Sequence, residues 1–309
     1  MRPLVALVLL ALVACGESQP TPSDPAALPK EIGGERPASV RYPRELVEGR
    51  RYPLVILLHG YGATGAAQDL YLGLSSLTTE YDFILVIPDG TLEDLTHGGT
   101  VEPAPGATPK RFWNATNACC NFHGADVDDV AYLTGLIDEA IDELPIDADR
   151  VYLFGHSNGG YMSYRMACDA TSRLAGIASL AGATYKDPSR CDPDGLVSVL
   201  QIHGSLDDTV PYEGSEFIPS ARESVEFWAE RAGCDVASPV AGETLDLEDN
   251  LPGAETEVLH FEGCDEPGYA FSLYTIVDGS HLPISTKSKN LSRRTLDWLL
   301  AQRRGGATP

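Results

Sequence analysis

The sequence predicts an α/β fold, in which a mostly parallel central sheet is covered by helices on both faces. Short, continuous apolar runs recur along the chain, and such runs are typical of strands buried on both sides. Segments in which apolar residues recur at helical spacing lie between them. A chain of 309 residues with 43% apolar content can bury a full core. We therefore expect a single domain over residues 38–309.

The expected elements alternate in order along the chain. The strands are expected at residues 54–58, 83–87, 151–154, 177–180, 197–202 and 271–277. The helices are expected at residues 66–80, at 126–144, directly after Ser157, and at 288–304. Buried strands that alternate with helices favour parallel pairing, because each helix returns the chain to the same edge of the sheet.

Two features lie between the second strand and the helix at 126–144. Residues 91–124 form a long irregular stretch rich in Gly, Pro, Asn and Thr, and loops of that length are usually functional. Asp126, Asp128 and Asp129 then open the helix, where negative charge suits the positive end of the helix dipole. A calcium site is the alternative interpretation of this acidic cluster.

The N-terminal segment Met1–Cys15 has the features of an export signal. Its apolar run, Leu4–Leu10, is too short to span a bilayer. Leu12–Cys15 (Leu-Val-Ala-Cys) resembles the bacterial lipobox, so we expect an exported protein that a lipid on Cys15 anchors to the membrane of the cell envelope. An ordinary secretory signal, with release outside the cell, is the alternative. Residues 16–37 lack periodicity and are expected to form a flexible tether.

Cysteine usage agrees with export. With Cys15 assigned to lipid, six of the seven cysteines remain, an even set suited to disulfides in an oxidising compartment. They are Cys119, Cys120, Cys168, Cys191, Cys234 and Cys264. We predict that Cys234 pairs with Cys264. Cys119 and Cys120 are expected to reach Cys168 and Cys191, because a bond between adjacent cysteines would be strained.

The charge balance is strongly acidic. Lys and Arg number 22 against 45 Asp and Glu, which gives a formal net charge of -23. Nucleic-acid binding is disfavoured, because it requires clustered cations and the chain has no run rich in Lys and Arg. We attribute the acidity to solubility in preference to a specific cationic partner.

The pentapeptide Gly155-His156-Ser157-Asn158-Gly159 follows an apolar run and precedes an expected helix. This G-x-S-x-G pattern in this context is typical of a sharp strand-to-helix turn that exposes a nucleophilic serine. Glycines flank the serine because strand, turn and helix approach closely there. The alternative is a Gly/Ser turn without chemistry.

A serine nucleophile needs a base and a carboxylate that orients the base. Among the seven histidines, His281 follows the last predicted strand in a loop that can bring imidazole over the strand ends. The others are expected to shape the sheet edge (His59, His156, His203), or lie in the long loop (His97, His123) or in a strand-like run (His260). Asp207 and Asp208 both follow the strand at 197–202, and only one of them can orient His281.

Two backbone N–H groups are candidates for an oxyanion hole. Asn158 N–H opens the helix beside the serine, and Tyr61 N–H follows the first expected strand. Phe112, Trp113 and His156 are the candidate substrate-binding residues, with the Tyr61 ring beside them as a further flat apolar surface. A small satellite core that pins the long loop is the alternative role of Phe112 and Trp113.

At these residues the chain resembles the secreted polyhydroxybutyrate depolymerase and feruloyl esterase group of α/β-hydrolases, lipoproteins included. The resemblance extends roughly over residues 51–283. The motifs that carry it are Leu57–Gly62, Trp113-Asn114, Cys119-Cys120, Val127–Val130, Gly155–Gly160, His203-Gly204, Asp207, Val210–Tyr212 and Gly279–His281. After His281 the chain has Leu282-Pro283 where the group usually has tryptophan and glycine, so we expect a different acyl pocket.

The resemblance implies an α/β-hydrolase fold and assigns the orienting carboxylate to Asp207. It implies a serine esterase that acts on small or oligomeric esters of the hydroxyalkanoate or hydroxycinnamate type, without metal or organic cofactor. We expect it to act as a monomer. The alternatives are a peptidase on the same fold and a catalytically dead, lipid-tethered binding protein.

Overall fold

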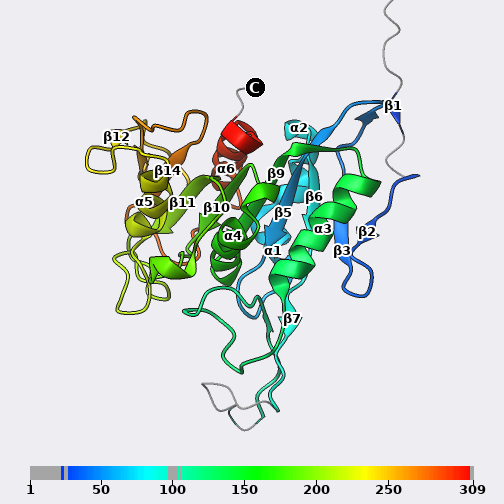
Figure 1. The fold of residues 1–309 in the computed structure, drawn as a ribbon, viewed down its shortest axis with the longest axis horizontal. Coiled ribbons are helices and arrows are strands. Elements are labelled where there is room, and N and C mark those ends of the chain that lie inside the picture. Colours follow the sequence, from blue (N-terminus) through cyan, green and yellow to red (C-terminus); the bar gives the residue numbers. More distant parts are fainter. Residues whose placement is uncertain (1–21, 24–26, 97–103, 105, 307–309) are drawn as a thin grey trace, which may run out of the picture.

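The computed structural model describes residues 22–23, 27–96, 104 and 106–306. The predicted export signal and the proposed lipid site at Cys15 lie outside these residues. Within them, a ten-stranded sheet has the order β12-β13-β14-β11-β10-β9-β5-β6-β3-β2 (Figure 1). None of the helices in the described ranges has the length and apolar character needed to cross a membrane.

Six adjacent strands form the parallel centre of this sheet, as the sequence predicts. They are β6 (Ile84–Ile87), β5 (Tyr52–Leu58), β9 (Ile146–His156), β10 (Gly176–Leu180), β11 (Ser198–Gly204) and β14 (Phe271–Ile276). Antiparallel strands extend both edges: β3 (Ala38–Arg41) and β2 (Glu31–Ile32) beside β6, and β13 (Thr256–His260) and β12 (Val240–Ala241) beside β14. Two small pairs lie apart, β1 (Pro22–Ser23) with β4 (Leu46–Val47) and β7 (Thr91–Leu92) with β8 (Arg111–Phe112).

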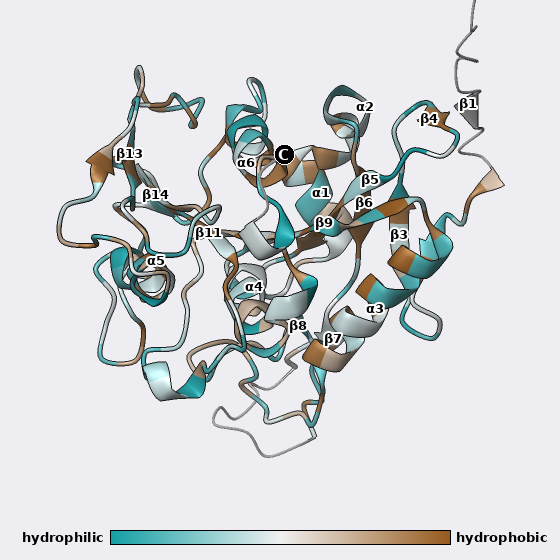
Figure 2. Cartoon of the chain, turned by 45° about the horizontal axis from the view of Figure 1, so that its top comes forward, coloured by the Kyte–Doolittle hydropathy of each residue, from teal (hydrophilic) through white to brown (hydrophobic). Residues whose placement is uncertain are grey.

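Helices cover both faces of the sheet, which confirms the predicted layering. On one face pack α3 (Asp129–Glu143), α4 (Asn158–Asp169) and α5 (Ala221–Arg231), and on the other pack α1 (Gly65–Leu72) and α6 (Asn290–Leu300) with α2 (Thr78–Tyr81) nearby. Alternate residues of β5 enter the two cores: Leu54 and Ile56 face α3 and α4, whereas Val55 and Leu57 face α1 and α6. Teal and brown residues alternate along α3, as expected of a helix with one buried stripe (Figure 2).

The helix expected at residues 66–80 is broken in the structure. It ends at Leu72, because Gly73 adopts a left-handed conformation with φ 69° and caps it. A short 3-10 turn, Leu74–Ser76, and α2 then follow. The helix expected from residue 126 begins at Asp129, and Asp128 caps it by accepting from Ala131 N–H at 2.9 Å. The acidic cluster therefore lies at the start of a helix, which was the first of the two interpretations of the sequence.

Among the observed elements without a counterpart in the sequence prediction are helix α5 and strand β13. Helix α5 begins with a capping box, in which the side chains of Ser220 and Glu223 accept each other's backbone N–H groups. This Ser-x-x-Glu pattern can be read in the sequence. Strand β13 pairs antiparallel with β14 and contains three polar residues, one of them the exposed Glu257, so it lacks the continuous apolar run on which the strand prediction depends.

The prediction of a flexible tether over residues 16–37 is wrong for its last part. Residues Glu31–Ile32 join the edge of the sheet, and Ile32 is buried in the core. Arg36 forms an ion pair with the buried Asp129 at 2.7 Å. These residues are ordered by contacts with distant elements, which the composition of the segment does not reveal.

The structure pairs Cys234 with Cys264, as predicted. The prediction that Cys119 and Cys120 reach Cys168 and Cys191 is wrong, because Cys119 is bonded to Cys120 and Cys168 to Cys191. Cys168 lies at the end of α4, and the turn that ends at Cys191 brings their Cα atoms to 5.1 Å, an ordinary span for a disulfide. Neither is then available to the long loop.

We predict that Cys234→Ser with Cys264→Ser lowers the free energy of unfolding by about 3 to 4 kcal/mol, because this disulfide closes a long loop, at a sequence separation of 30, in the unfolded chain. The matched control is Cys119→Ser with Cys120→Ser, which removes a bond at a sequence separation of 1. Urea unfolding of both double variants measures the difference. Equal losses would contradict the loop-closure explanation.

Candidate active site

The structure brings Ser157, Asp207 and His281 together at the carboxyl edge of the sheet. Ser157 follows β9, Asp207 lies in the turn after β11, and His281 lies in the loop after β14. His281 Nδ1 is 2.7 Å from Asp207 Oδ2, and His281 Nε2 is 2.9 Å from Ser157 Oγ. Because the carboxylate only accepts, Nδ1 carries the proton and Nε2 is left to accept from the serine hydroxyl. The arrangement can transfer a proton from the hydroxyl to the imidazole.

The backbone at Ser157 is held in a strained conformation, with φ 54° and ψ -119°. Its N–H donates to Leu180 O at 2.8 Å, which fastens the turn to β10. A Cβ on Gly155 would lie 2.0 Å from Gly159 O, and one on Gly159 would lie 2.2 Å from Leu58 O. Only glycine allows β5, β9 and α4 to approach this closely, as the sequence pattern predicts.

Asp207 is buried, and its carboxylate is the most heavily bonded acid at the site. Oδ1 accepts the N–H groups of Thr209 and Val210 at 2.9 and 2.8 Å, while Oδ2 faces His281 and His203. Burial raises the pKa of this carboxyl, but hydrogen bonds from the His203 and His281 rings and from Val210 N–H outweigh it and hold the pKa well below the usual range. Asp207 is therefore ionised at neutral pH.

Asp208 is exposed, and within the described part of the chain its carboxylate accepts only the Thr209 hydroxyl, at 3.2 Å. The structure thus brings Asp207, and not its neighbour, to His281.

His203 has a contact that the sequence analysis missed, because it was expected only to shape the sheet edge. Its Nε2 lies 2.8 Å from Val210 O and 3.1 Å from Asp207 Oδ2, and its Nδ1 accepts from the Gln201 amide at 3.0 Å. Tyr164 in turn donates to Gln201 Oε1 at 2.8 Å. In the sequence, the four-residue spacing of His203 and Asp207 was the signal from which this contact could have been predicted. His203 supports the carboxylate from the side opposite His281.

The two predicted oxyanion donors lie beside Ser157. Asn158 is the first residue of α4, and the first N–H groups of a helix have no intrahelical acceptor. Tyr61 follows Gly60, where a Cβ would lie 3.4 Å from Ser157 Cβ, so the backbone before Tyr61 packs against the serine. Both N–H groups are thus candidates to bind an oxygen attached to the carbon that Ser157 attacks.

His156 is a candidate substrate-binding residue that the structure turns toward protein groups instead. It is 5% exposed, and its Nε2 donates to His281 O at 3.1 Å. Burial, reinforced by the nearby His281 charge, lowers its pKa to about 4, so the ring is neutral at neutral pH. His156 therefore supports the backbone of His281.

Phe112 and Trp113, the other candidate substrate-binding residues, are fully buried, with 1% and 0% exposed. Trp113 N–H donates to Asn158 Oδ1 at 2.7 Å, Asn158 Nδ2 donates back to Trp113 O at 3.0 Å, and the indole donates to His59 O at 3.1 Å. The expectation that they line a cleft is wrong. Trp113 pins the long loop to α4 and to His59, directly after β5, which is the alternative left open by the sequence.

The Tyr61 side chain is partly exposed and also fastened to the long loop. Its hydroxyl donates to the buried carboxylate of Glu93, and its ring contacts Phe122 edge to face. Burial and the Glu93 carboxylate raise the pKa of Tyr61, so the phenol stays protonated. His123 also approaches Glu93, at 3.6 Å.

Two exposed leucines flank the site. Leu206 precedes Asp207 and is 63% exposed, and Leu282 follows His281 and is 52% exposed. Leu206 and Leu282 lie on the two loops that carry the carboxylate and the imidazole, and we call them the apolar rim. In the sequence, only their positions next to Asp207 and His281 indicated that they lie near the site.

Comparison with known proteins identifies relatives. A family model described as phospholipase/carboxylesterase matches residues 46–224. Feruloyl esterase B of Piromyces equi is 29% identical over 181 residues, 55% of this chain and 31% of that protein. Feruloyl esterase C of Emericella nidulans is 22% identical over 79% of this chain and 93% of that protein. An acetyl xylan esterase from Aspergillus awamori has a TM-score of 0.59 at 15% identity, covering 90% of this chain and 98% of that chain, a likeness of fold.

The relatives are not all matched over their full length. The matched segment spans 31% of feruloyl esterase B, and a further curated relative is matched over 45% of its length. The family model includes Ser157 and Asp207 and ends before His281.

We predict that Gly159→Ala destabilises the protein by about 3 kcal/mol, because the new methyl group would overlap the Leu58 carbonyl. Gly135→Ala is the matched control: it also lies in a helix, α3, but a Cβ there meets nothing within 4 Å. Helix propensity should then make Gly135→Ala neutral or stabilising by up to about 1 kcal/mol. Thermal or urea unfolding measures both, and similar effects would refute the close packing at Gly159.

Proposed function

Since the chain belongs to the phospholipase/carboxylesterase family, we propose that Ser157, His281 and Asp207 form its catalytic triad. The predicted α/β-hydrolase fold is confirmed by the family and by the structural neighbour. The family and the relatives named as esterases support the predicted class of enzyme, a serine carboxylic-ester hydrolase. The single observation that carries the proposal is the continuous pair of hydrogen bonds from Asp207 through His281 to Ser157.

In the first half of the reaction, Ser157 Oγ attacks the ester carbonyl while His281 Nε2 takes the hydroxyl proton. The tetrahedral intermediate places its negative oxygen between the N–H groups of Tyr61 and Asn158. It collapses as the bond to the alcohol oxygen breaks, and the imidazolium returns the proton to that oxygen. Ser157 is left as the acyl ester.

In the second half, water replaces the alcohol. His281 Nε2 takes a proton from water as its oxygen attacks the acyl carbon, and the proton then returns to Ser157 Oγ as the acid leaves. Asp207 stays ionised throughout, because its low pKa prevents it from taking the proton, and it stabilises the imidazolium in both halves.

The substrates that we propose are small or oligomeric esters of the hydroxyalkanoate or hydroxycinnamate type. Two relatives are named feruloyl esterases, which supports the second class. The exposed Leu206 and Leu282 give an acyl chain or an aromatic ring an apolar surface next to the triad.

We also propose that the protein is exported and held at the cell envelope by a lipid on Cys15, acting there as a monomer. Three disulfides among the described residues favour an oxidising compartment. The lipobox-like Leu12–Cys15 supports the lipid.

We expect a fluorophosphonate probe to label the purified protein on Ser157 and to abolish hydrolysis of p-nitrophenyl and hydroxycinnamate methyl esters. The reason is that such probes trap a serine whose hydroxyl is activated by a neighbouring base. Ser157→Ala should prevent both labelling and turnover, and His281→Ala should lose turnover to a similar extent, since triad members act as a unit. Labelling at another serine, or turnover by Ser157→Ala, would refute the proposal.

Asp207→Asn should lower kcat by about 10⁴, because the amide cannot hold His281 in the required tautomer. Asp208→Asn is the matched control: it removes the same charge from the adjacent, exposed position and should leave kcat within twofold or so of the unmodified enzyme, since surface substitutions have small effects. Steady-state kinetics on p-nitrophenyl acetate measures both. A larger loss from Asp208→Asn would reassign the carboxylate.

A further inference from the structure

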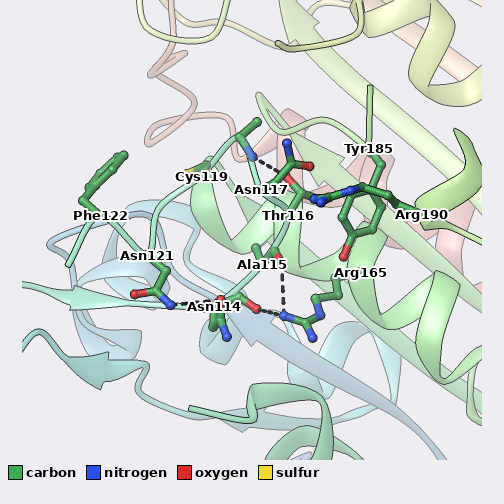
Figure 3. Close-up of a pocket in the computed structure, with 11 residues that line it drawn as sticks. Asn114, Ala115, Thr116, Asn117, Cys119, Asn121, Phe122, Arg165, Tyr185 and Arg190 are labelled. Carbon is green, nitrogen blue, oxygen red and sulfur yellow. Dashed lines mark hydrogen bonds between the residues drawn. The ribbon is translucent and has the colours of Figure 1, made fainter. Parts of the chain in front are cut away.

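A polar pocket of about 330 Å³ lies against α4, between the segment after Trp113 and the turn before Cys191 (Figure 3). The mechanism described above does not use it. Two arginines, Arg165 and Arg190, reach into it from different elements, and Tyr185 lies between them.

Arg165 is held firmly in place. Its Nη1 donates to Asn114 O at 2.5 Å and to Ala115 O at 3.2 Å, and its Nε pairs with Asp169 at 3.2 Å. These contacts leave Nη2 without a partner among the described residues. A guanidinium fixed through one edge presents its remaining donors at low entropic cost.

Arg190 is fixed through its neighbour. The disulfide between Cys191 and Cys168 ties this turn to α4, and Cys168 lies three residues after Arg165, on the same side of the helix. The Arg190 side chain is exposed and makes no ion pair with any residue that the structure describes. Most other arginines of the described chain are paired with carboxylates, from Arg36 with Asp129 to Arg304 with Asp149.

The charge of the pocket is opposite to that of the protein. The chain carries a formal net charge of -23, yet none of the described aspartates and glutamates lines this pocket. Two carboxylates lie outside it: Asp169 pairs with Arg165, and Asp187 is within electrostatic range of Arg190. An anion is repelled by the protein as a whole and attracted here. The planar fork of a guanidinium matches the two oxygens of a carboxylate.

The pocket is connected to the triad through α4. Asn158 and Arg165 are seven residues apart, hence on one face of the helix, and they bind consecutive residues of the same segment: Asn158 binds Trp113, and Arg165 binds Asn114 and Ala115. The eight residues from Ser157 to Arg165 extend about 12 Å along the helix axis. An extended oligomeric ester matches this length.

We propose that the pocket formed by Arg165 and Arg190 binds a carboxylate that the ester substrate carries at the end remote from the bond that Ser157 cleaves. The inference rests on the proposed esterase function and specifies its substrate: an acidic ester, such as an oligomer of a hydroxy acid with a free carboxyl end. The apolar rim of Leu206 and Leu282 contacts the part of the substrate near the cleaved bond.

The test compares carboxylate esters with neutral esters of the same shape. One series consists of mono-p-nitrophenyl esters of dicarboxylic acids of increasing length, each beside its ω-carboxamide. A second series places the carboxylate or the carboxamide on the alcohol. We expect kcat/KM to favour the longer carboxylates over their carboxamides by about tenfold in at least one series, as for one charge-assisted hydrogen bond. The preference should reside in KM.

Arg190→Gln should remove this preference, by lowering kcat/KM for the carboxylate esters about tenfold more than for the carboxamide esters. Arg294→Gln is the matched control, because it removes the same charge from an exposed residue of α6 whose nearest carboxylate is 3.9 Å away, and it should keep the preference.

The outcomes separate the inference from the function on which it rests. If the carboxamide esters are hydrolysed but carboxylates have no advantage, or if Arg190→Gln keeps the advantage, the pocket does not bind the substrate and the esterase function stands. If no ester of either series is hydrolysed, the proposed function is refuted and the inference with it.

Discussion

The buried negative charge of Asp207 is the constraint on which the site depends. Its side chain has no exposed surface, and a charge taken out of water is tolerated only when it is paired and hydrogen-bonded. His203 and Val210 meet it from β11 and its turn, whereas His281 comes from the loop after β14. Satisfying one carboxylate therefore joins two loops that are far apart in the sequence. The same contacts keep the carboxylate ionised, which is what an imidazole beside it requires.

Ser157 is positioned by a different means, the close approach of three elements at glycines. The left-handed backbone at Ser157 is tolerated because Gly155 and Gly159 let β5, β9 and α4 touch, and Trp113 locks the long loop onto Asn158. The long loop thus has two roles along its length. Around Trp113 it is part of the core that holds the serine, and after Asn114 it forms one wall of the arginine pocket.

Apolar and positively charged side chains lie in separate places around the triad: the apolar rim next to it and the two arginines along α4. An acidic protein whose cations are mostly paired keeps Arg190 free beside α4, while Leu206 and Leu282 expose apolar surface on the loops of the triad. A substrate with an apolar ester and a remote carboxylate fits both features. In the binding mode that we propose, Arg165 and Arg190 hold the remote carboxylate.

The sequence by itself determined the parallel strands, the turn at Ser157 and the histidine that contacts this serine, because a local pattern indicates each of them. The patterns are an apolar run, two glycines around a serine, and a histidine after a strand. The sequence also determined the start of α3 at its aspartates. Only the tertiary structure decided that His203 and not solvent meets Asp207, that Phe112 and Trp113 are core residues, that Cys168 bonds Cys191, and that residues 31–36 are folded onto the sheet and α3. Apart from the contact of His203 with Asp207, whose four-residue spacing is a local signal, these outcomes depend on which distant segments pack against each other, and local spacing does not report such contacts.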